Sequence, residues 1–419
     1  MSAENTSDDA AAAVATADAD VHQLVLQFLS EHGYVDAQAA LEREARVATT
    51  GCFVPGELER ALGAAALRRM GDVDEALVAL RRPGMGKHAS GPTSCIEALH
   101  AGNITCCCWS SDGAWLLTAG ADSRVRCSSG SGGSGGSSVQ LDSGVVSLDV
   151  HPSGRVLAGC MSGGVSVLAL APTGELAQLA TWKRHGKYAH CVRWHPGGEL
   201  FASGSFDHNL HVYRAAGEGY APLPPIRRDG VVESVAWVCA GELLVASVRG
   251  ADALAVWSSA ELSALDGEAA GGAMPTPTQH WAIDPEGAAV GRAANVLSLV
   301  VSPAAEGRWV SAATDAGWIA VLDARRQGAV VRRLARGPAR DDLWAGRPCH
   351  AWSHCGDYIY ATSEEAEGPL LVWDVGTEAV VAELRGHTAS VREVAAHPDG
   401  TGALASAGFD KAVRLWAAM

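Results

Sequence analysis

Three polar side chains near residue 400 have the types that hydrolytic chemistry requires. They are His387, Ser406 and Asp410. In a Ser-His-Asp triad, the His takes the proton of the Ser hydroxyl and the Asp orients the His. Such a site also needs the Ser to be exposed beside groups that stabilise an oxyanion. The residue types alone do not meet that requirement, so the sequence favours a structural role over a catalytic one.

These residues belong to a unit that recurs along the chain. Its His and Asp are 23 residues apart in this copy, and 22 residues apart in the copies that begin at His185 and His100. An alternating apolar strand, a turn and a second alternating strand fit that spacing. Weaker copies, each a strand pair around a turn, bring the total to seven units and occupy residues 145–170, 231–257, 296–323 and 349–374.

The unit resembles the WD repeat, which forms a four-stranded blade of a β-propeller. The resemblance implies an all-β, seven-bladed WD-repeat propeller, with six or eight blades as alternatives. Because no unit can bury its sheet faces alone, the blades should stack radially into a closed ring. The resemblance also implies a buried hydrogen-bond network in the complete blades. Its two sets would be His387, Ser406, Asp410 and Trp416, and His185, Ser203, Asp207 and Tyr213.

Closure of the ring requires one more strand. The last unit ends three residues after Trp416, which leaves no room for a fourth strand there. Residues 94–99 alternate in polarity and lie just before His100. We therefore expect residues 94–99 to pair with the last strand, which removes two open sheet edges.

The N-terminal part of the chain differs from the repeats. Residues 1–19 are rich in Ala and acidic residues, which predicts a disordered tail. Residues 20–47 predict a short helical hairpin and residues 48–81 predict further short helices. Residues 82–93 are rich in Gly and Pro, which predicts a linker to the propeller at residues 94–419.

The hairpin contains two apolar pairs, a Gly-Tyr pair and a terminal Glu, namely Leu24-Val25, Phe28-Leu29, Gly33-Tyr34 and Glu44. This pattern resembles the LisH motif, a small helical module that self-associates. The resemblance implies a homodimer, because a hairpin this short cannot bury enough apolar surface alone. The residues expected at the dimer contact are Leu24, Phe28, Leu29, Tyr34 and Leu41. The alternative is that these residues pack on the flank of the propeller.

Charge and composition limit the classes of function. The net charge of −15 argues against general binding to nucleic acid or to anionic membranes, because the long-range electrostatic term would be repulsive. The N-terminus has no basic segment followed by an apolar core, and no run of 18 apolar residues occurs. We therefore expect an intracellular protein, with the cytoplasm favoured over the nucleus.

The 11 cysteines are expected to be reduced and buried in an intracellular protein. Cys106, Cys107 and Cys108 are consecutive, but successive side chains of a strand point to opposite faces, so the three cannot bind one metal ion. The chain has no Cys-x-x-Cys pair, and residues 84–87 lack the spacing of a phosphate-binding loop. We predict no metal and no cofactor.

The loops of a propeller can vary without disturbing the ring, so its function resides in them. Aromatic and Arg residues are favoured at the centres of interfaces. The candidates for partner contacts are Trp182, Lys183, Arg184, Lys187, Tyr188, Arg227, Arg228 and Arg325. The alternative is that they form a solvated and functionally neutral rim.

Three hypotheses of function follow. The first is a non-enzymatic scaffold that dimerises through the hairpin and presents propeller loops to protein partners. The second is a substrate receptor of a cullin-type ubiquitin ligase, because residues 319–325 resemble the WD-x-Arg docking box, with Leu322 in place of its Trp. The third, a propeller enzyme, would need carboxylates or His residues that converge from equivalent strand ends, and the repeats show no such set. We therefore predict no catalytic residues.

Overall fold

The computed structural model of the chain describes residues 75–97, 99–130, 136–217, 219–265, 275–284, 294–335, 348–363 and 368–418. The chain divides after Arg82 into two units. Of the first unit the structure describes only the helix α4 (Glu75–Leu80) and the two residues that follow it. The predicted tail, the hairpin and most of the further helices lie outside the described residues. So do the expected dimer contacts Leu24, Phe28, Leu29, Tyr34 and Leu41.

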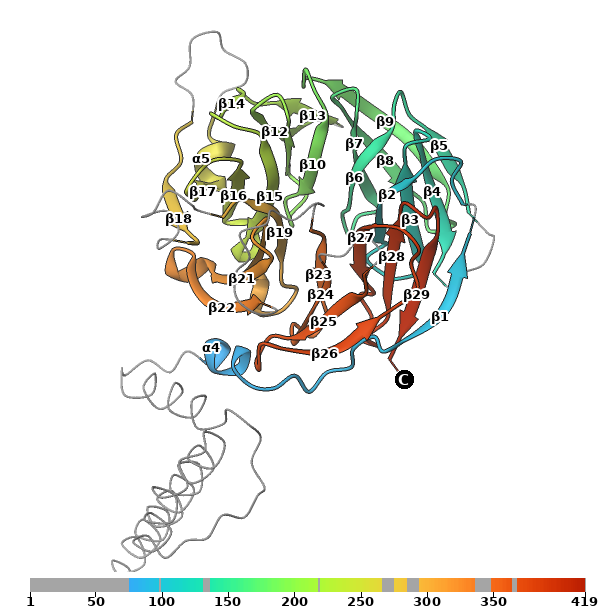
Figure 1. Cartoon of the computed structure of the whole chain (residues 1–419). Coiled ribbons are helices and arrows are strands. Elements are labelled where there is room, and N and C mark those ends of the chain that lie inside the picture. The colour runs from blue at the N-terminus through green and yellow to red at the C-terminus, as the bar shows by residue number, and fades with distance from the viewer. Residues whose placement is uncertain are drawn as a thin grey trace, which may run out of the picture. The chain divides into compact units, whose positions relative to one another are not determined.

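The described strands of the second unit form seven antiparallel sheets around a central axis (Figure 1). This arrangement confirms the predicted seven-bladed propeller. The first strand of each blade contacts the first strands of its neighbours, so these strands form the inner ring. We number the blades in chain order.

The strands of the first three blades follow the repeats along the chain. Blade 1 contains β2 (Ile104–Trp109), β3 (Trp115–Gly120), β4 (Arg124–Ser129) and β5 (Ser138–Gln140). Blade 2 contains β6 (Val145–Val150), β7 (Arg155–Cys160), β8 (Gly164–Leu170) and β9 (Leu176–Lys183). Blade 3 contains β10 (Ala189–Trp194), β11 (Leu200–Ser205), β12 (Asn209–Ala216), β13 (Gly219–Pro222) and β14 (Ile226–Arg227).

The remaining blades complete the ring. Blade 4 contains β15 (Val232–Val238), β16 (Leu243–Val248), β17 (Ala253–Ser258) and β18 (Gln279–Ala282). Blade 5 contains β19 (Val296–Val301), β20 (Trp309–Thr314), β21 (Trp318–Asp323) and β22 (Ala329–Ala335). Blade 6 contains β23 (His350–Trp352), β24 (Tyr358–Thr362), β25 (Leu370–Asp374) and β26 (Ala379–Leu384). Blade 7 contains β27 (Val391–Ala396), β28 (Leu404–Gly408), β29 (Val413–Ala417) and β1 (Gly91–Ile96).

The helical elements in the described part of the propeller are short. They are α5 (Ser259–Ser263) and the 3-10 turns η1 (Cys239–Gly241), η2 (Ala305–Gly307) and η3 (Ala324–Arg326). Among the described residues, no helix has both the length and the apolar character needed to span a membrane.

The ring is closed by strands from opposite ends of the propeller. β1 pairs antiparallel with β29, with Ser94 opposite Leu415 and Ile96 opposite Val413. The predicted closure is therefore confirmed, although β1 begins three residues before the expected segment and ends at Ile96. The pairing extends to Gly91 through a bulge at Thr93, whose hydroxyl donates to the Leu415 carbonyl over 3.0 Å.

The residues predicted to be a linker are bound to the propeller from residue 84 onward. The Gly84 amide donates to Asp374 Oδ2 over 2.9 Å, and the Gly86 amide donates to Asp357 Oδ2 over 2.9 Å. The Tyr358 hydroxyl donates to the Gly84 carbonyl over 3.0 Å. A Cβ atom at position 84 would lie 2.7 Å from the Tyr358 ring, so this close approach requires glycine.

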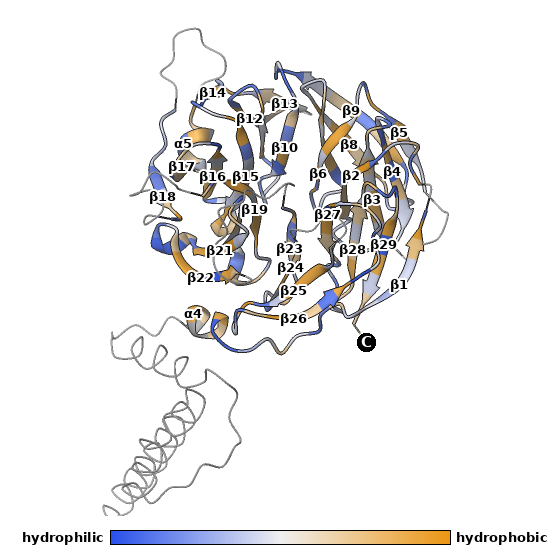
Figure 2. Cartoon of the chain, viewed as in Figure 1, coloured by the Kyte–Doolittle hydropathy of each residue, from blue (hydrophilic) through white to orange (hydrophobic). Residues whose placement is uncertain are grey.

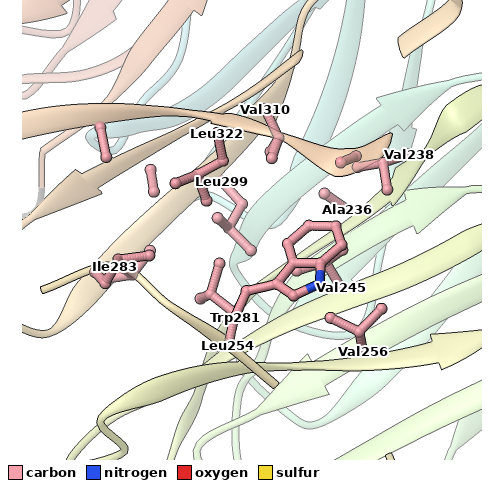
Figure 3. Close-up of a cluster of buried hydrophobic side chains, with 14 of the residues drawn as sticks. Ala236, Val238, Val245, Leu254, Val256, Trp281, Ile283, Leu299, Val310 and Leu322 are labelled. Carbon is pink, nitrogen blue, oxygen red and sulfur yellow. The ribbon is translucent and has the colours of Figure 1, made fainter. Parts of the chain in front are cut away.

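Hydrophobic side chains fill the space between adjacent blades. Strands such as β8 and β25 are largely hydrophobic along their length (Figure 2). Between blades 4 and 5, Trp281 is 1% exposed and packs with Leu299 and Leu322, among other residues (Figure 3). Leu322 thus fills buried space at the position where the WD repeat would have Trp. Each blade depends on its neighbours to cover its sheet faces.

Candidate functional site

The His-Ser-Asp set of blade 7 forms a closed hydrogen-bond network. His387 Nδ1 lies 2.8 Å from Asp410 Oδ2, and His387 Nε2 lies 2.7 Å from Ser406 Oγ. Trp416 Nε1 donates to Ser406 Oγ over 2.8 Å. A neutral His387 that donates from Nδ1 and accepts from the Ser406 hydroxyl satisfies all four groups. Ser406 is 0% exposed, so it is not an accessible nucleophile and the set serves as an internal brace.

Blade 3 repeats the network without the indole bond. His185 Nδ1 lies 3.2 Å from Asp207 Oδ1, and His185 Nε2 lies 2.8 Å from Ser203 Oγ. Burial acts to raise the pKa of Asp207, but hydrogen bonds from His185 and Gly186 outweigh it and hold the pKa well below its usual range. Tyr213 is fully buried in this blade, and its ring stacks on Phe201 with centroids 4.3 Å apart.

Blade 1 holds a third copy of the network. His100 Nδ1 lies 3.0 Å from Asp122 Oδ1, and His100 Nε2 lies 2.9 Å from Thr118 Oγ1. Burial lowers the pKa of His100, although Asp122 acts in the opposite direction. The three copies therefore keep a His, a hydroxyl and a carboxylate together inside the blade.

Buried histidines should make the propeller sensitive to acid. Burial lowers the pKa of His350 to about 4 and that of His211 to about 3. An unfolded His has a pKa of about 6.5, so the unfolded chain binds more protons below that pH and the free energy of unfolding falls as the pH drops. Each residue should contribute a loss of about 2 kcal/mol at pH 5 relative to pH 8. Urea unfolding at several pH values measures this loss.

Two variants sharpen the pH measurement. His350→Gln should make the decline between pH 7 and pH 5 shallower, because one of the buried titrating groups is removed. His354→Gln is the matched control, since His354 is exposed. Equal slopes for wild type and His350→Gln would contradict the assignment.

The residues predicted to contact partners have different environments. Trp182 of blade 2 packs against blade 3, with its ring centroid 5.7 Å from that of Phe201 and 5.5 Å from that of Tyr213. Trp182 is therefore not an exposed partner contact as predicted. Successive side chains of a strand alternate, so along β9 Trp182 is half-buried and Lys183 is exposed. Lys183 Nζ lies 3.9 Å from Asp142 Oδ2.

The other predicted contacts lie on the surface or against it. Tyr188 is 47% exposed, and Arg184, Lys187 and Arg227 are exposed as well. Arg228 is half-buried and lies over the Trp257 ring at 5.6 Å.

Arg325 belongs to the segment that resembles the ligase docking box. It is exposed on η3, with Nη2 3.3 Å from Glu306 Oε2. The ligase hypothesis stays a prediction.

A cavity of about 280 Å³ opens at the central axis. Every blade contributes at least one residue from the start of its innermost strand or from the position just before it. These residues are Thr105, Ser147, Cys191, Ser234, Ser298, Cys349 and Glu393. We call this cavity the axial pocket. Of the predicted partner contacts, only Tyr188 is among the residues that line it.

A repeated β-bulge directs further side chains into the axial pocket. Six of the inner strands shift register after their first residue, which leaves one residue of each unpaired. A bulge re-aims the side chain of its extra residue. Four of these bulged residues line the pocket, namely Thr105, Val146, His190 and Arg392. The bulges thus place the side chains of these four residues at the axis without disturbing the outer strands.

The mouth of the pocket is aromatic. Tyr188 and Phe409 are 47% and 39% exposed, and Phe206 also lines the pocket. Arg392 is held over the Phe409 ring, with Cζ 5.1 Å from the ring centroid. The His190 ring meets Phe206 edge-on at 4.6 Å.

Charged groups support the pocket wall between blades 3 and 4. Glu233 is buried, and its Oε2 lies 3.2 Å from His190 Nε2. Arg249 Nη2 lies 2.6 Å from Glu233 Oε1, and the Arg249 side chain is partly exposed. The Arg249 cation thus balances the buried Glu233 carboxylate.

Hydroxyl groups make the wall rigid. Ser147 Oγ accepts from the Val192 amide over 3.2 Å, and Ser234 Oγ accepts from the Leu299 amide over 3.0 Å. Each bond joins the inner strands of two different blades. The pocket is therefore formed in advance of any ligand.

This pocket is not predicted from the sequence, because each blade supplies only a few of its residues. His190 and Glu233 are equivalent bulged residues in contact with each other, and of the two only His190 lines the pocket. The signal that could have revealed the pocket is the second residue of each inner strand. Aligned repeats place these bulged residues in one column.

Most described thiols are buried and inert. Burial raises the pKa of Cys107 and of Cys108 well above the usual range, which disfavours the reactive thiolate. Cys95 and Cys355 are exposed, which corrects the expectation that all cysteines are buried. Cys95 lies on the outermost strand β1, and Cys355 lies in the turn after β23. Within the described ranges, no three His, Cys, Asp or Glu side chains are grouped so that they could hold a metal ion.

Comparison with protein families supports the repeat assignment. The family model "WD domain, G-beta repeat" matches residues 93–127, 176–214 and 378–417. The second and third matches each begin with the outermost strand of one blade, β9 or β26, and continue through three strands of the next. The first match has the same order, since it starts within β1 of blade 7. The chain therefore contains WD40 repeats and folds as a seven-bladed propeller, a fold that is typically a protein-interaction scaffold.

Proposed function

We propose that this protein is a non-enzymatic scaffold that binds a polypeptide at the axial pocket. The observation that carries this proposal is a preformed pocket with an exposed aromatic mouth, at the point where all seven blades meet. Aromatic and Arg side chains are enriched in the residues that dominate binding energy at interfaces. Partially exposed Tyr188 and Phe409 fit that description.

The size of the pocket favours a side chain of a larger ligand. Its volume of about 280 Å³ lies just below the range for small-molecule sites, roughly 300 to 1,000 Å³. One or two side chains of a bound polypeptide would fill it, while the surrounding loops contact the rest of the segment. The net charge of −15 favours protein partners over nucleic acid or anionic membranes.

Removing the aromatic mouth should weaken partner binding strongly. In the Tyr188→Ala and Phe409→Ala double variant, the affinity for a partner retained by wild type should fall about tenfold or more. Both side chains are partly exposed, so the thermal stability should change little. Quantitative affinity purification of the full chain, followed by titration of the purified partner, measures the loss.

A matched control separates this site from general surface effects. Leu179 is 57% exposed on the outer strand β9, so Leu179→Ala removes a comparable apolar side chain far from the axis. Its partner affinity should equal that of wild type. Equal recovery of the partner by the double variant would contradict the proposed site.

We also propose that two chains pair through the hairpin at residues 20–47, in the cytoplasm. The support is the LisH-like spacing of its apolar residues. Pairing would present two propellers at once and raise the effective concentration for bivalent partners.

Light scattering of the full chain measures the pairing. Wild type should have the mass of a dimer, and Phe28→Glu should give a monomer, because a charge on the apolar contact must be desolvated. A chain that starts at residue 83 should also be a monomer, and it keeps the residues that bind Asp357 and Asp374. A monomer mass for wild type would contradict the proposal.

A further inference from the structure

We infer that the axial pocket selects an acidic segment of polypeptide, which inserts one apolar side chain into the mouth and places a carboxylate against Arg392. This inference rests on the proposed function and specifies the chemistry of the ligand.

The charges at the pocket are opposite to those of the chain as a whole. The chain carries 47 acidic and 32 basic side chains, excluding His. The pocket is lined by Arg193 and Arg392 but by one acidic residue, Glu393. Lys187, which is next to the pocket residue Tyr188, adds an exposed positive charge. Arg193 already interacts with the buried carboxyl of Asp149, so Arg392 and the exposed Lys187 are the cations that attract anionic segments to this point of the surface.

Arg392 is the cation best placed to bind a carboxylate. Its bulged position directs it to the axis, and the Phe409 ring holds its guanidinium at the mouth. In the described part of the chain, Arg392 has no carboxylate partner. A guanidinium binds a carboxylate through two parallel N–H bonds, and stacking on an aromatic ring leaves those N–H groups available.

The buried carboxylate of Glu233 does not cancel this preference. It lies 2.6 Å from the Arg249 guanidinium and 3.2 Å from His190, so its charge is already balanced inside the wall. The Asp410 side chain, next to Phe409, is only 6% exposed and lies 2.8 Å from His387 inside the blade, so it is withdrawn from the mouth. The cations at the mouth are therefore the charges that an incoming segment meets.

The mouth itself favours an apolar side chain. Beside its aromatic residues, Val146, Met161 and Pro348 line the pocket. Burial of one Leu, Met or Phe side chain contributes about 1.5–3 kcal/mol. Charge and apolar surface together thus define a segment in which an apolar residue is flanked by Asp or Glu.

Selection from a random library identifies such segments directly. Random 12-residue peptides displayed on phage are selected on the immobilised full chain, and the enriched peptides are synthesised with a fluorescent label. We expect an excess of Asp and Glu around one apolar or aromatic position. Fluorescence anisotropy then gives the Kd of each peptide for wild type and variants.

Two matched changes test the contact with Arg392. Arg392→Gln should weaken the enriched peptide about tenfold, and so should replacement of the critical Glu of the peptide by Gln. The two changes together should weaken it little more than either alone, because they remove the same contact. Arg227→Gln removes an exposed charge that does not line the pocket and should leave the Kd unchanged.

The outcomes distinguish this inference from the proposed function. If the enriched peptides lack acidic residues, the inference of an acidic ligand is wrong. If Tyr188→Ala still weakens the binding of those peptides, the proposed site at the axial pocket is nevertheless supported. Acidic peptides that bind Arg392→Gln as tightly as wild type would also overturn it. A selection that enriches no peptide would count against both the inference and the proposed function. Displacement of the peptide by a labelled 20-nucleotide single strand at equal concentration would also count against both.

Discussion

Removal of residues 412–419 should abolish the folded propeller and not merely unfold one blade. These residues contain β29, which pairs with β28 on one side and with β1 on the other. Val413 and Trp416 are 0% and 1% exposed, and burial of each such side chain contributes about 1.5–3 kcal/mol. Loss of these contacts and of both pairings is comparable with the whole stability of a domain, about 5–15 kcal/mol.

Circular dichroism during thermal unfolding measures this effect. The shortened chain should lack the cooperative transition of wild type, because an open ring exposes two sheet edges and the cores beside them. A chain that ends at residue 417 keeps β29 and serves as the control, with an unchanged transition. A shortened chain that melts like wild type would contradict closure through β1 and β29.

Asp323→Ala should lower the free energy of unfolding by about 3–5 kcal/mol. The Asp323 side chain is 0% exposed, and its Oδ1 accepts from Arg308 Nε over 2.9 Å. Its Oδ1 also accepts from the Arg325 amide over 3.0 Å at the start of η3. The change leaves the Arg308 guanidinium, which is 6% exposed, without its counter-charge.

A double variant isolates the unpaired charge as the cause. Arg308→Met with Asp323→Leu removes both charges and keeps apolar volume, so it should be less destabilised than Asp323→Ala. Urea unfolding of wild type and both variants gives the three free energies. A double variant that is less stable than the single variant would show that the loss comes from another contact.

The repeat pattern was sufficient to predict the ring and its closure. Strand alternation before His100 indicated the extra strand, because closure must use a segment outside the seven units. The exact start of β1 was not predictable, since the bulge at Thr93 depends on the Leu415 carbonyl more than 300 residues away.

The contacts of residues 84–86 could not be predicted for a related reason. A Gly-rich segment has no periodicity, and here its order comes from hydrogen bonds that backbone amides donate to Asp357 and Asp374. Those partners lie 271 to 290 residues further along the chain. Local sequence therefore predicts a linker where the folded chain has a bound segment.

The candidate site was predicted only in part. The loop position of Tyr188 predicts a partner contact, and Tyr188 lines the axial pocket. The sequence predicts the same for Trp182, but Trp182 packs against Phe201 and Tyr213, because the strand β9 extends as far as Lys183. The sequence does not predict Arg392 at the site, since its position depends on a bulge that turns its side chain toward the axis.

The most direct test of binding at the axial pocket is site-specific cross-linking in the full chain. A photoreactive benzoylphenylalanine in place of Phe409 should form a covalent product with the bound polypeptide, and an enriched library peptide should compete for it. The same group in place of Leu179, which is exposed on β9, should give no product. A product from position 179 and none from position 409 would contradict the proposal that the axial pocket is the binding site.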